Sequence, residues 1–368
     1  MNMRFPTLLA LAISISVHAQ QTDQVKRWLQ QMDKNNDGKI SKDESTGLMK
    51  RFFDRNDTNK DGTLNGPELT ALSQRLNRNR GNQRNNANRN QQPGMSTERM
   101  LAQVPKDVIA EADIAYRPGK SKAWRLDLFH PKAKSDKPRP GIVFIHGGGW
   151  RNGDKRTGTF LSGAIDYAQK GYVTITVNYR LTGEAPFPAC IEDVKCAVRW
   201  FRAHAKKYNL DPKSIGAYGN SAGAHLVSIL GLVKPGAGLE GDGPWKDQSS
   251  MVQAVAASAT PTDFNLFGPP REGDTRFVDK RWSVDELRRL SSPINHVSKD
   301  APPFLLFHGT ADRTVNVKHS DIFVEALKKA DCDVTYIRID DAGHGVFNQQ
   351  VKQTKPAMEE FFARTLRE

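Results

Sequence analysis

The chain has 368 residues with only three cysteines, so a disulfide scaffold is excluded and the fold must be held by its apolar core. Lysine and arginine number 54 against 41 acidic residues, which gives a formal net charge of +13. This balance favours anionic surfaces such as uronic-acid polysaccharides. Nucleic acid is not the expected partner, because we find no array of basic and aromatic residues of the kind that binds single strands.

Residues 1–19 have the pattern of a secretory signal peptide. Arg4 precedes an apolar stretch from Leu8 to Val17, and Val17-His18-Ala19 offers the small residues of a cleavage site. The apolar stretch is shorter than the ~20 residues that a membrane helix needs, and no other stretch approaches that length. We therefore expect a secreted or periplasmic protein that begins at Gln20 and has no membrane span.

Two segments that follow match the twelve-residue calcium loop of the EF-hand. Their ligand positions are Asp33, Asn35, Asp37, Lys39, Ser41 and Glu44 in the first loop, and Asp57, Asn59, Asp61, Thr63, Asn65 and Glu68 in the second. A hard cation prefers such alternating oxygen ligands, with a backbone carbonyl at position seven and a bidentate glutamate at position twelve. Gly38 and Gly62 stand where each loop must bend. Ile40 and Leu64 occupy position eight, where paired loops meet through a short β-bridge.

The flanking residues recur at helical spacing, so residues 20–76 are predicted to form a small all-α EF-hand pair. We expect it to bind Ca²⁺ in a structural role, or to dock the protein on a cell wall or another protein, without taking part in catalysis. Residues 77–98 are rich in Asn, Arg, Gln and Gly and are predicted to be a disordered linker. The catalytic domain is expected to span residues 99–368.

The first motif of the catalytic domain is a glycine-rich loop after an apolar run. Ile142 to Ile145 reads as a buried strand, and it ends in His146-Gly147-Gly148-Gly149-Trp150. Glycines let a loop turn its backbone N–H groups inward, and a carbonyl oxygen that becomes negative needs two or three such donors. The amides of Gly147 and Gly148 are therefore predicted to be oxyanion donors.

The second motif lies between a strand-like and a helix-like run. Ile215 to Tyr218 leads into Gly219-Asn220-Ser221-Ala222-Gly223, and His225 to Leu232 follows. This is the strand-turn-helix context of the G-x-S-x-G nucleophile elbow. A side chain on either glycine would collide with the neighbouring element, so the turn leaves Ser221 strained and exposed. The N–H of Ala222, at the start of the helix, is the third predicted oxyanion donor.

The last motifs supply an acid and a base. The strand-like run Phe304 to Phe307 ends in a loop with Asp312, and an acid belongs at that end of a parallel strand. A further strand, Val334 to Ile339, is followed by Gly343-His344-Gly345, whose glycines leave His344 free to turn toward the serine. Other acids and histidines that compete for these roles or are structural are Asp340, Asp341, His225, His308 and His319.

The order Ser, Asp, His along the chain is that of the α/β-hydrolase fold and not of the two large serine-protease folds. In this reading His344 removes the proton of Ser221, because a neutral imidazole titrates in the range needed to activate a hydroxyl. Asp312 fixes the tautomer of the imidazole and offsets its positive charge. The expected fold is α/β, with a mostly parallel sheet flanked by helices, preceded by the EF-hand pair.

These motifs resemble a known family. The chain is similar to hormone-sensitive-lipase-like bacterial esterases, and most similar to the bifunctional feruloyl and acetylxylan esterase (BD-FAE) branch. The motifs that carry this resemblance are HGGGW, NYRL at 178–181, EAPFP at 184–188, IEDV at 191–194, GNSAGAHL at 219–226, HGTAD at 308–312 and AGHG at 342–345. The resemblance implies the same triad and the same oxyanion donors. The run Ala222-Gly223-Ala224-His225 also resembles the arylformamidase branch.

Together these features predict a secreted serine carboxylic-ester hydrolase that removes acetyl or feruloyl groups from carbohydrate esters. The alternatives are an arylformamidase-like amidohydrolase, and a calcium-dependent wall-binding protein with a vestigial hydrolase domain. Residues 234–246 and 264–299 lie between core elements and are expected to shape the substrate site. Trp245, Phe267 and Trp282 either line that site or pack on the surface. Glu184 and Asp193 are expected to fix a loop through ion pairs or helix-end contacts.

Overall fold

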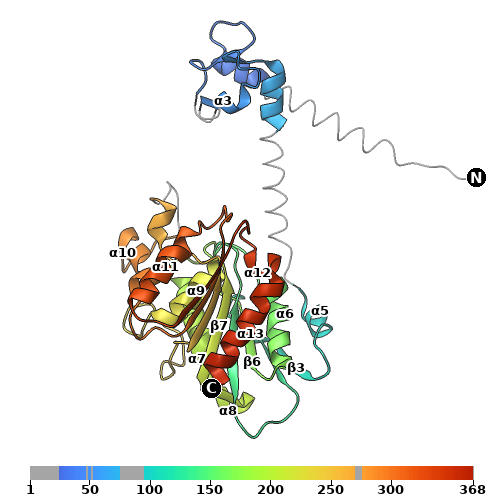
Figure 1. Ribbon diagram of the computed structural model, residues 1–368, viewed down its shortest axis with the longest axis vertical. Helices are drawn as coiled ribbons and strands as arrows, with labels where there is room; N and C mark the ends of the chain where they lie inside the picture. Colours follow the sequence, from blue (N-terminus) through green and yellow to red (C-terminus); the bar gives the residue numbers. More distant parts are fainter. Residues whose placement is uncertain (1–24, 47–48, 51–52, 75–94, 270–275, 368) are drawn as a thin grey trace, which may run out of the picture. The chain divides into compact units, whose positions relative to one another are not determined.

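The structure, a computed structural model, describes residues 25–46, 49–50, 53–74, 95–269 and 276–367 (Figure 1). The chain divides into two compact units, residues 1–92 and 93–368. The predicted signal peptide, and the predicted linker as far as residue 94, lie outside the described residues. The last residues of that predicted linker, 95–98, belong to the second unit, where helix α5 spans Thr97–Leu101.

The first unit contains the two predicted calcium loops. Strand β1 (Ile40–Ser41) pairs antiparallel with β2 (Thr63–Leu64), and Ile40 stands opposite Leu64 as the position-eight prediction requires. Helical residues 25–32 and 66–74 flank the loops, and α3 (Phe53–Asn56) lies between them. The buried core of this unit consists of Met32, Ile40, Met49, Phe53, Leu64 and Leu69.

The second unit is built on an eight-stranded sheet with the order β10-β9-β8-β7-β5-β6-β4-β3. Its strands are β3 (Val108–Ala115), β4 (Arg125–Pro131), β5 (Arg139–Ile145), β6 (Val173–Val177), β7 (Leu210–Asn220), β8 (Ala254–Ser258), β9 (Phe304–Gly309) and β10 (Val334–Ile339). The six strands from β10 to β6 pair in parallel, whereas β4 and β3 run antiparallel to their neighbours. The predicted mostly parallel sheet is confirmed.

Helices cover both faces of this sheet. They are α6 (Gly158–Gln169), α7 (Ala189–Ala203), α8 (Ala205–Tyr208), α9 (Ala222–Leu232), α10 (Val284–Leu290), α11 (Lys318–Lys329), α12 (Val346–Gln349) and α13 (Val351–Arg367), with 3₁₀ turns η1 (Phe264–Phe267) and η2 (Pro293–His296). Side chains of β5 alternate between two cores: Val143 and Ile145 pack with α7 and α9, whereas Ile142 and Phe144 pack with α6 and α13. This alternation follows from the two-residue period of a strand.

The topology places the predicted motifs at one edge of the sheet. Strands β5, β7 and β9 run parallel, as do β9 and β10, so the loops that follow them leave from the same edge. The predicted insertion over 264–299 contains η1, α10 and η2. No helix within the described ranges is both long enough and apolar enough to cross a membrane.

Candidate active site

Ser221 occupies the turn between β7 and α9 with φ of 55° and ψ of −120°, a conformation that non-glycine residues rarely adopt. A Cβ on Gly219 would lie 2.3 Å from the carbonyl carbon of Gly223, and one on Gly223 would lie 2.1 Å from the carbonyl oxygen of Ile145. Both flanking glycines are therefore required by close backbone contacts, as predicted. The Ser221 N–H donates to the Ser258 carbonyl at 2.8 Å, which ties the strained residue to β8.

The structure brings the three predicted side chains together. His344 Nε2 lies 3.0 Å from Ser221 Oγ, and His344 Nδ1 lies 2.8 Å from Asp312 Oδ2. The Nδ1–H donates to the carboxylate, which leaves the lone pair of Nε2 facing the serine hydroxyl. Ser221 is 9% exposed and the His344 side chain 29% exposed, so the pair can meet a solute while Asp312 stays covered.

Asp312 is held ionised by its surroundings. Burial raises the pKa of this carboxyl group, but hydrogen bonds from His308, His344 and two backbone amides outweigh burial and bring the pKa well below its usual range. The amides are those of Thr314 and Val315, which donate to Oδ1 at 2.7 and 3.0 Å. A carboxylate fixed in this way can orient His344 and offset its charge.

The competing acids lie outside this chain of hydrogen bonds. Asp340 is exposed and pairs with Arg338 at 3.4 Å. Asp341 is also exposed, and its backbone N–H donates to Thr310 Oγ1. Neither side chain has a hydrogen bond or ion pair with His344 in the part of the chain that is described, so Asp312 is the acid that pairs with this histidine.

Two of the other histidines are buried in structural positions. His225 Nδ1 accepts from Trp150 Nε1 at 3.2 Å, Nε2 donates to the Ser291 carbonyl, and burial lowers the pKa of the ring to about 4. His319 Nδ1 accepts from the Thr262 N–H, and burial likewise lowers its pKa to about 4. These rings are neutral packing groups near neutral pH.

The three predicted oxyanion donors lie next to the serine. A Cβ on Gly147 would lie 2.7 Å from the Asn220 carbonyl oxygen and 3.4 Å from Ser221 Cβ, so the glycine-rich loop passes directly beside the nucleophile. Ala222 is the first residue of α9, where a backbone N–H has no partner within the helix. The amides of Gly147, Gly148 and Ala222 donate no hydrogen bond to any described residue. They are available to a negatively charged oxygen.

Sequence reasoning missed two residues that support this loop. His146 donates from Nδ1 to the Gly147 carbonyl at 2.8 Å. This bond fixes the orientation of the peptide group between Gly147 and Gly148. Tyr179 stacks on the His146 ring at 4.5 Å between centroids and donates its hydroxyl to the His146 carbonyl. The signal was present, because His146 opens HGGGW and Tyr179 lies in NYRL, but the sequence does not say that they touch.

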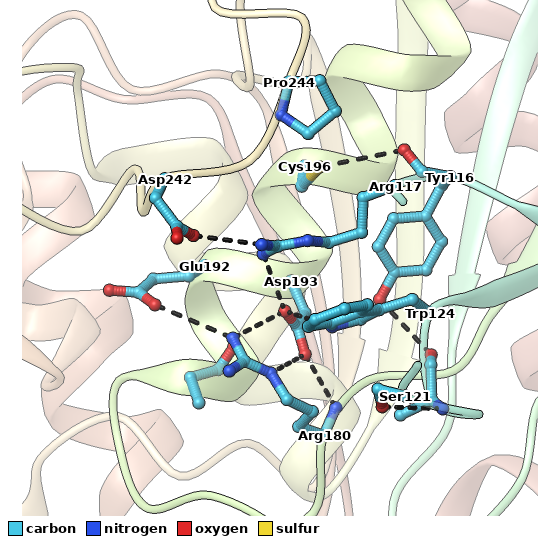
Figure 2. A network of polar contacts seen from close by, with 12 residues as sticks. Tyr116, Arg117, Ser121, Trp124, Arg180, Glu192, Asp193, Cys196, Asp242 and Pro244 are labelled. Atoms are coloured by element: carbon cyan, nitrogen blue, oxygen red, sulfur yellow. Dashed lines mark hydrogen bonds and ion pairs between the residues drawn. The ribbon is translucent and has the colours of Figure 1, made fainter. Parts of the chain in front are cut away.

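Asp193 anchors the segment after β6 to α7 (Figure 2). Its carboxylate is fully buried and accepts from the backbone N–H, Nε and Nη2 of Arg180 and from Nε1 of Trp124. Arg117 and Arg180 lie over the Trp124 ring at 4.1 and 5.4 Å, and Arg117 also pairs with Asp242. None of these contacts involves the Ser221, Asp312 or His344 side chains. The geometry is that of the expected loop-fixing ion pair.

The three aromatic residues expected either to line the substrate site or to pack on the surface have different surroundings. Trp245 donates from Nε1 to the Tyr116 carbonyl and packs against His204. Trp282 lies under the guanidinium of Arg281 at 4.3 Å. Phe267 is 42% exposed and contacts the His319 ring at 4.7 Å. Of the three, Phe267 alone presents a largely exposed apolar ring.

The EF-hand loops have the donor chemistry that calcium requires. In the first loop Asp33 accepts from the backbone N–H groups of Asp37 and Gly38, and Asn35 Oδ1 also accepts from Asp37. Glu44 reaches across the loop to the N–H groups of Lys34 and Ser41, each at 2.9 Å. These bonds gather the oxygens of positions one, three and twelve within the loop, where a hard cation would be ligated.

The second loop repeats the pattern. Asp57 accepts from Asp61 and Gly62, and Glu68 accepts from the N–H groups of Thr58 and Asn65. Gly38 and Gly62 have φ of 78° and 80°, the left-handed bend expected at position six. Over the described residues, no group of three or more His, Cys, Asp and Glu side chains is placed to hold a metal ion. Calcium would therefore depend on the amide, hydroxyl and backbone oxygens as well.

A mostly parallel sheet that presents a serine on a tight strand-to-helix turn defines the second unit as an α/β-hydrolase domain. The model of the BD-FAE family matches residues 126–327, which is 202 of the 368 residues, and an EF-hand model matches residues 25–44. The chain therefore belongs to the BD-FAE family, and the predicted resemblance is confirmed.

Several of the relatives and solved structures that the chain resembles are esterases by name. The esterase LipC of Mycobacterium tuberculosis is 32% identical over 62% of this chain and 58% of its own length. A truncated carbohydrate esterase from gut microbiota is 27% identical with a TM-score of 0.62, covering 72% of this chain and 99% of that one. An esterase of Thermogutta terrifontis with propionate bound is 27% identical with a TM-score of 0.58, covering 70% and 94%.

These matches confirm the predicted class of the domain, a carboxylic-ester hydrolase. The chain spans about three fifths of the length of the curated relatives it matches.

Proposed function

We propose that this protein is an exported serine esterase that removes acyl groups from carbohydrate esters. The observation that carries the proposal is the hydrogen-bond chain from Ser221 Oγ through His344 to Asp312, beside the free amides of Gly147, Gly148 and Ala222. A nucleophile, a base, an orienting acid and oxyanion donors at hydrogen-bond range are what acyl transfer through a covalent intermediate requires.

The geometry gives each group one task. Ser221 Oγ forms a bond to the acyl carbon while its proton passes to His344 Nε2, and the carbonyl oxygen becomes an oxyanion that faces the three amides. His344 then gives this proton to the alcohol oxygen as the bond between that oxygen and the acyl carbon breaks. Asp312 keeps the Nδ1–H of His344 in place and offsets the charge of the imidazolium. Water repeats both steps on the acyl-enzyme and releases the acid.

The proposed substrate class rests on three further observations. One structural neighbour is named a carbohydrate esterase, and the Thermogutta terrifontis esterase was solved with propionate bound. The net charge of +13 suits substrates on anionic polysaccharide. We infer acetyl or feruloyl groups on plant or algal polysaccharides as the esters that are cleaved.

We further infer that the EF-hand loops bind Ca²⁺ outside the catalytic chemistry. Glu44 and Glu68 would supply carboxylates at position twelve, and Asp33 and Asp57 at position one. Calcium would hold the loop oxygens together against their mutual repulsion. The signal-like residues 1–19 support export, where calcium at millimolar levels is available to such modules.

The proposal is tested by the burst of p-nitrophenol from p-nitrophenyl acetate and by release of acetate from acetylated xylan. The wild-type chain should show a burst equal to the concentration of folded enzyme, and Ser221→Ala should lower turnover by about 10³-fold or more. A Ser221→Ala variant as active as the wild type would refute the assignment of the nucleophile. N-formylkynurenine is the comparison substrate, and faster turnover of this amide than of any ester would favour an amidohydrolase.

A further inference from the structure

His308, in β9, is a fully buried histidine that the proposed reaction does not use. Its Nδ1 lies 2.6 Å from Ser320 Oγ on α11, and its Nε2 lies 2.9 Å from the Val315 carbonyl oxygen. The same Nε2 is 3.3 Å from Asp312 Oδ2, and both side chains are 0% exposed. The ring thus joins a core strand, the loop that carries the catalytic acid, and the helix that follows it.

The partners fix which nitrogen of His308 carries hydrogen. The Val315 carbonyl can only accept, so Nε2 must carry the hydrogen that lies between them. That N–H also faces the nearby carboxylate oxygen of Asp312. In the neutral ring Nδ1 then holds a lone pair, which accepts the hydroxyl hydrogen of Ser320.

Asp312 consequently lies between two imidazole rings. Its Oδ2 faces the N–H groups of His344 at 2.8 Å and of His308 at 3.3 Å, while Oδ1 accepts two backbone amides. Three hydrogen bonds hold this carboxylate in place, and the Nε2–H of His308, which is bonded to the Val315 carbonyl, lies close enough to Oδ2 to offset part of its charge. If one donor were lost, the carboxylate would attract the proton of its remaining imidazole partner more strongly.

We propose that His308 is a positioning residue for the catalytic acid, holding Asp312 Oδ2 against His344 and sharing its charge, and that Ser320 orients His308. This inference rests on the proposed function, because it assigns to His308 a part in the same reaction. His308 does not touch the substrate or Ser221; it acts through Asp312. Removal of its N–H should leave substrate binding intact and change the proton affinity of His344.

The other ionisable groups that face this cluster are His319 on α11 and Asp263, which precedes η1. His319 is buried, and burial lowers its pKa to about 4, so it stays neutral in an assay run between pH 5 and 9. The acid limb of the pH dependence of kcat/KM then reports on the pair formed by His344 and Asp312. A shift of that limb in a His308 variant reports on the coupling through Asp312.

The test uses four variants of the full chain. His308→Leu removes the N–H, His308→Gln keeps a donor near the position of Nε2, and Ser320→Ala removes the hydroxyl that orients the ring. His204→Leu is the control, because His204 also bonds a carbonyl and stacks on Trp200 but precedes α8, toward the amino end of β7 and away from Ser221. The pH dependence of kcat and KM is measured with p-nitrophenyl acetate, per active site counted by the burst.

We expect His308→Leu to lower kcat about tenfold or more at unchanged KM, since the polar N–H group that lies 3.3 Å from the Asp312 carboxylate is lost. The acid limb should move to higher pH, because a less solvated Asp312 stabilises the His344 imidazolium. Ser320→Ala should shift it in the same direction by less. The kcat of His308→Gln should stay within about threefold of the wild-type value. The kcat of His204→Leu should equal the wild-type value.

If the acid limb and the kcat per active site of both His308→Leu and Ser320→Ala equal those of the wild type, the role of His308 is refuted. If His308→Leu does not fold, an unchanged acid limb and an unchanged kcat in Ser320→Ala also refute the role of His308. A failure of the proposed function itself gives different results. The wild type then shows no burst, or Ser221→Ala remains active, and the inference about His308 is refuted together with the proposed function.

Discussion

Several histidines near the active site are kept neutral by burial. His225 and His319 each have a pKa lowered to about 4, and burial also lowers the pKa of His146 below its ordinary value. His225 is fully enclosed and uses both nitrogens, one toward Trp150 and one toward the Ser291 carbonyl. A charge on this ring would have no acceptor for the proton on Nδ1, because Trp150 also donates there.

This burial predicts how stability depends on pH. The unfolded chain protonates His225 near pH 6.5 while the folded chain does so only near 4, so the unfolded state binds more protons in this window. The contribution of His225 is fully present above pH 6.5 and is lost as the pH falls toward 4. When the pH is lowered from 7.5 to 4.5, the free energy of unfolding measured in urea should fall further for the wild type than for His225→Gln, by about 1–3 kcal/mol. Equal losses in the two proteins would show that His225 is not the titrating group.

Single residues also mark the limit of what the sequence predicts about the site. The sequence predicts Ser221, Asp312 and His344 because each stands in a motif after a strand-like run, and the structure places them in one chain of hydrogen bonds. It does not predict that Asp312 also faces His308, which depends on how α11 packs on β9. Contacts between elements far apart in sequence are fixed by tertiary packing, and a single sequence carries no local signal for them.

At the scale of elements, apolar runs that end in polar motifs predict the strands that hold the site. The run Val334 to Ile339 coincides with β10, and α9 begins directly after Ser221. Strands β3 and β4 have no such signal. β3 mixes charged and apolar residues, with a change of register between Glu111 and Ile114, so its pattern resembles neither a buried strand nor a clean alternation.

Helix α9 passes so close to β5 that Gly223, near the start of the helix, should not tolerate a side chain. In Gly223→Ala the new Cβ would meet the Ile145 carbonyl oxygen at 2.1 Å, so backbone must move at the start of α9. We expect a loss of about 3 kcal/mol or more in unfolding free energy and a loss of esterase turnover. Gly183→Ala is the matched control, because a Cβ there has nothing within 4 Å and its backbone is not left-handed. A Gly223→Ala variant as stable as Gly183→Ala would contradict the close approach.

For the whole molecule, the division into two units places the predicted calcium loops and the proposed catalytic residues in different units. Each unit has its own buried core, with Phe53 and Leu64 in the first, and Phe144 and Leu306 in the second. The EF-hand pattern predicts the first unit because its ligands and its bend are fixed by position in the loop. The shape of the substrate site is not predicted in this way, because the insertion over 264–299 follows no repeating pattern.

Calcium should therefore stabilise the EF-hand unit without changing esterase turnover. At a free calcium concentration a hundredfold above Kd, each occupied site adds about 2.7 kcal/mol to the free energy of unfolding of the unit that holds it. In calorimetry of the full chain, chelator should lower the transition of the EF-hand unit and leave that of the hydrolase unit in place. The double variant Glu44→Gln and Glu68→Gln should melt without calcium dependence, since it loses the position-twelve carboxylate of both loops. Turnover of p-nitrophenyl acetate should be equal in calcium and in chelator. A fall in kcat on chelation, restored by calcium in the wild type but not in the double variant, would show instead that the first unit controls the active site of the second.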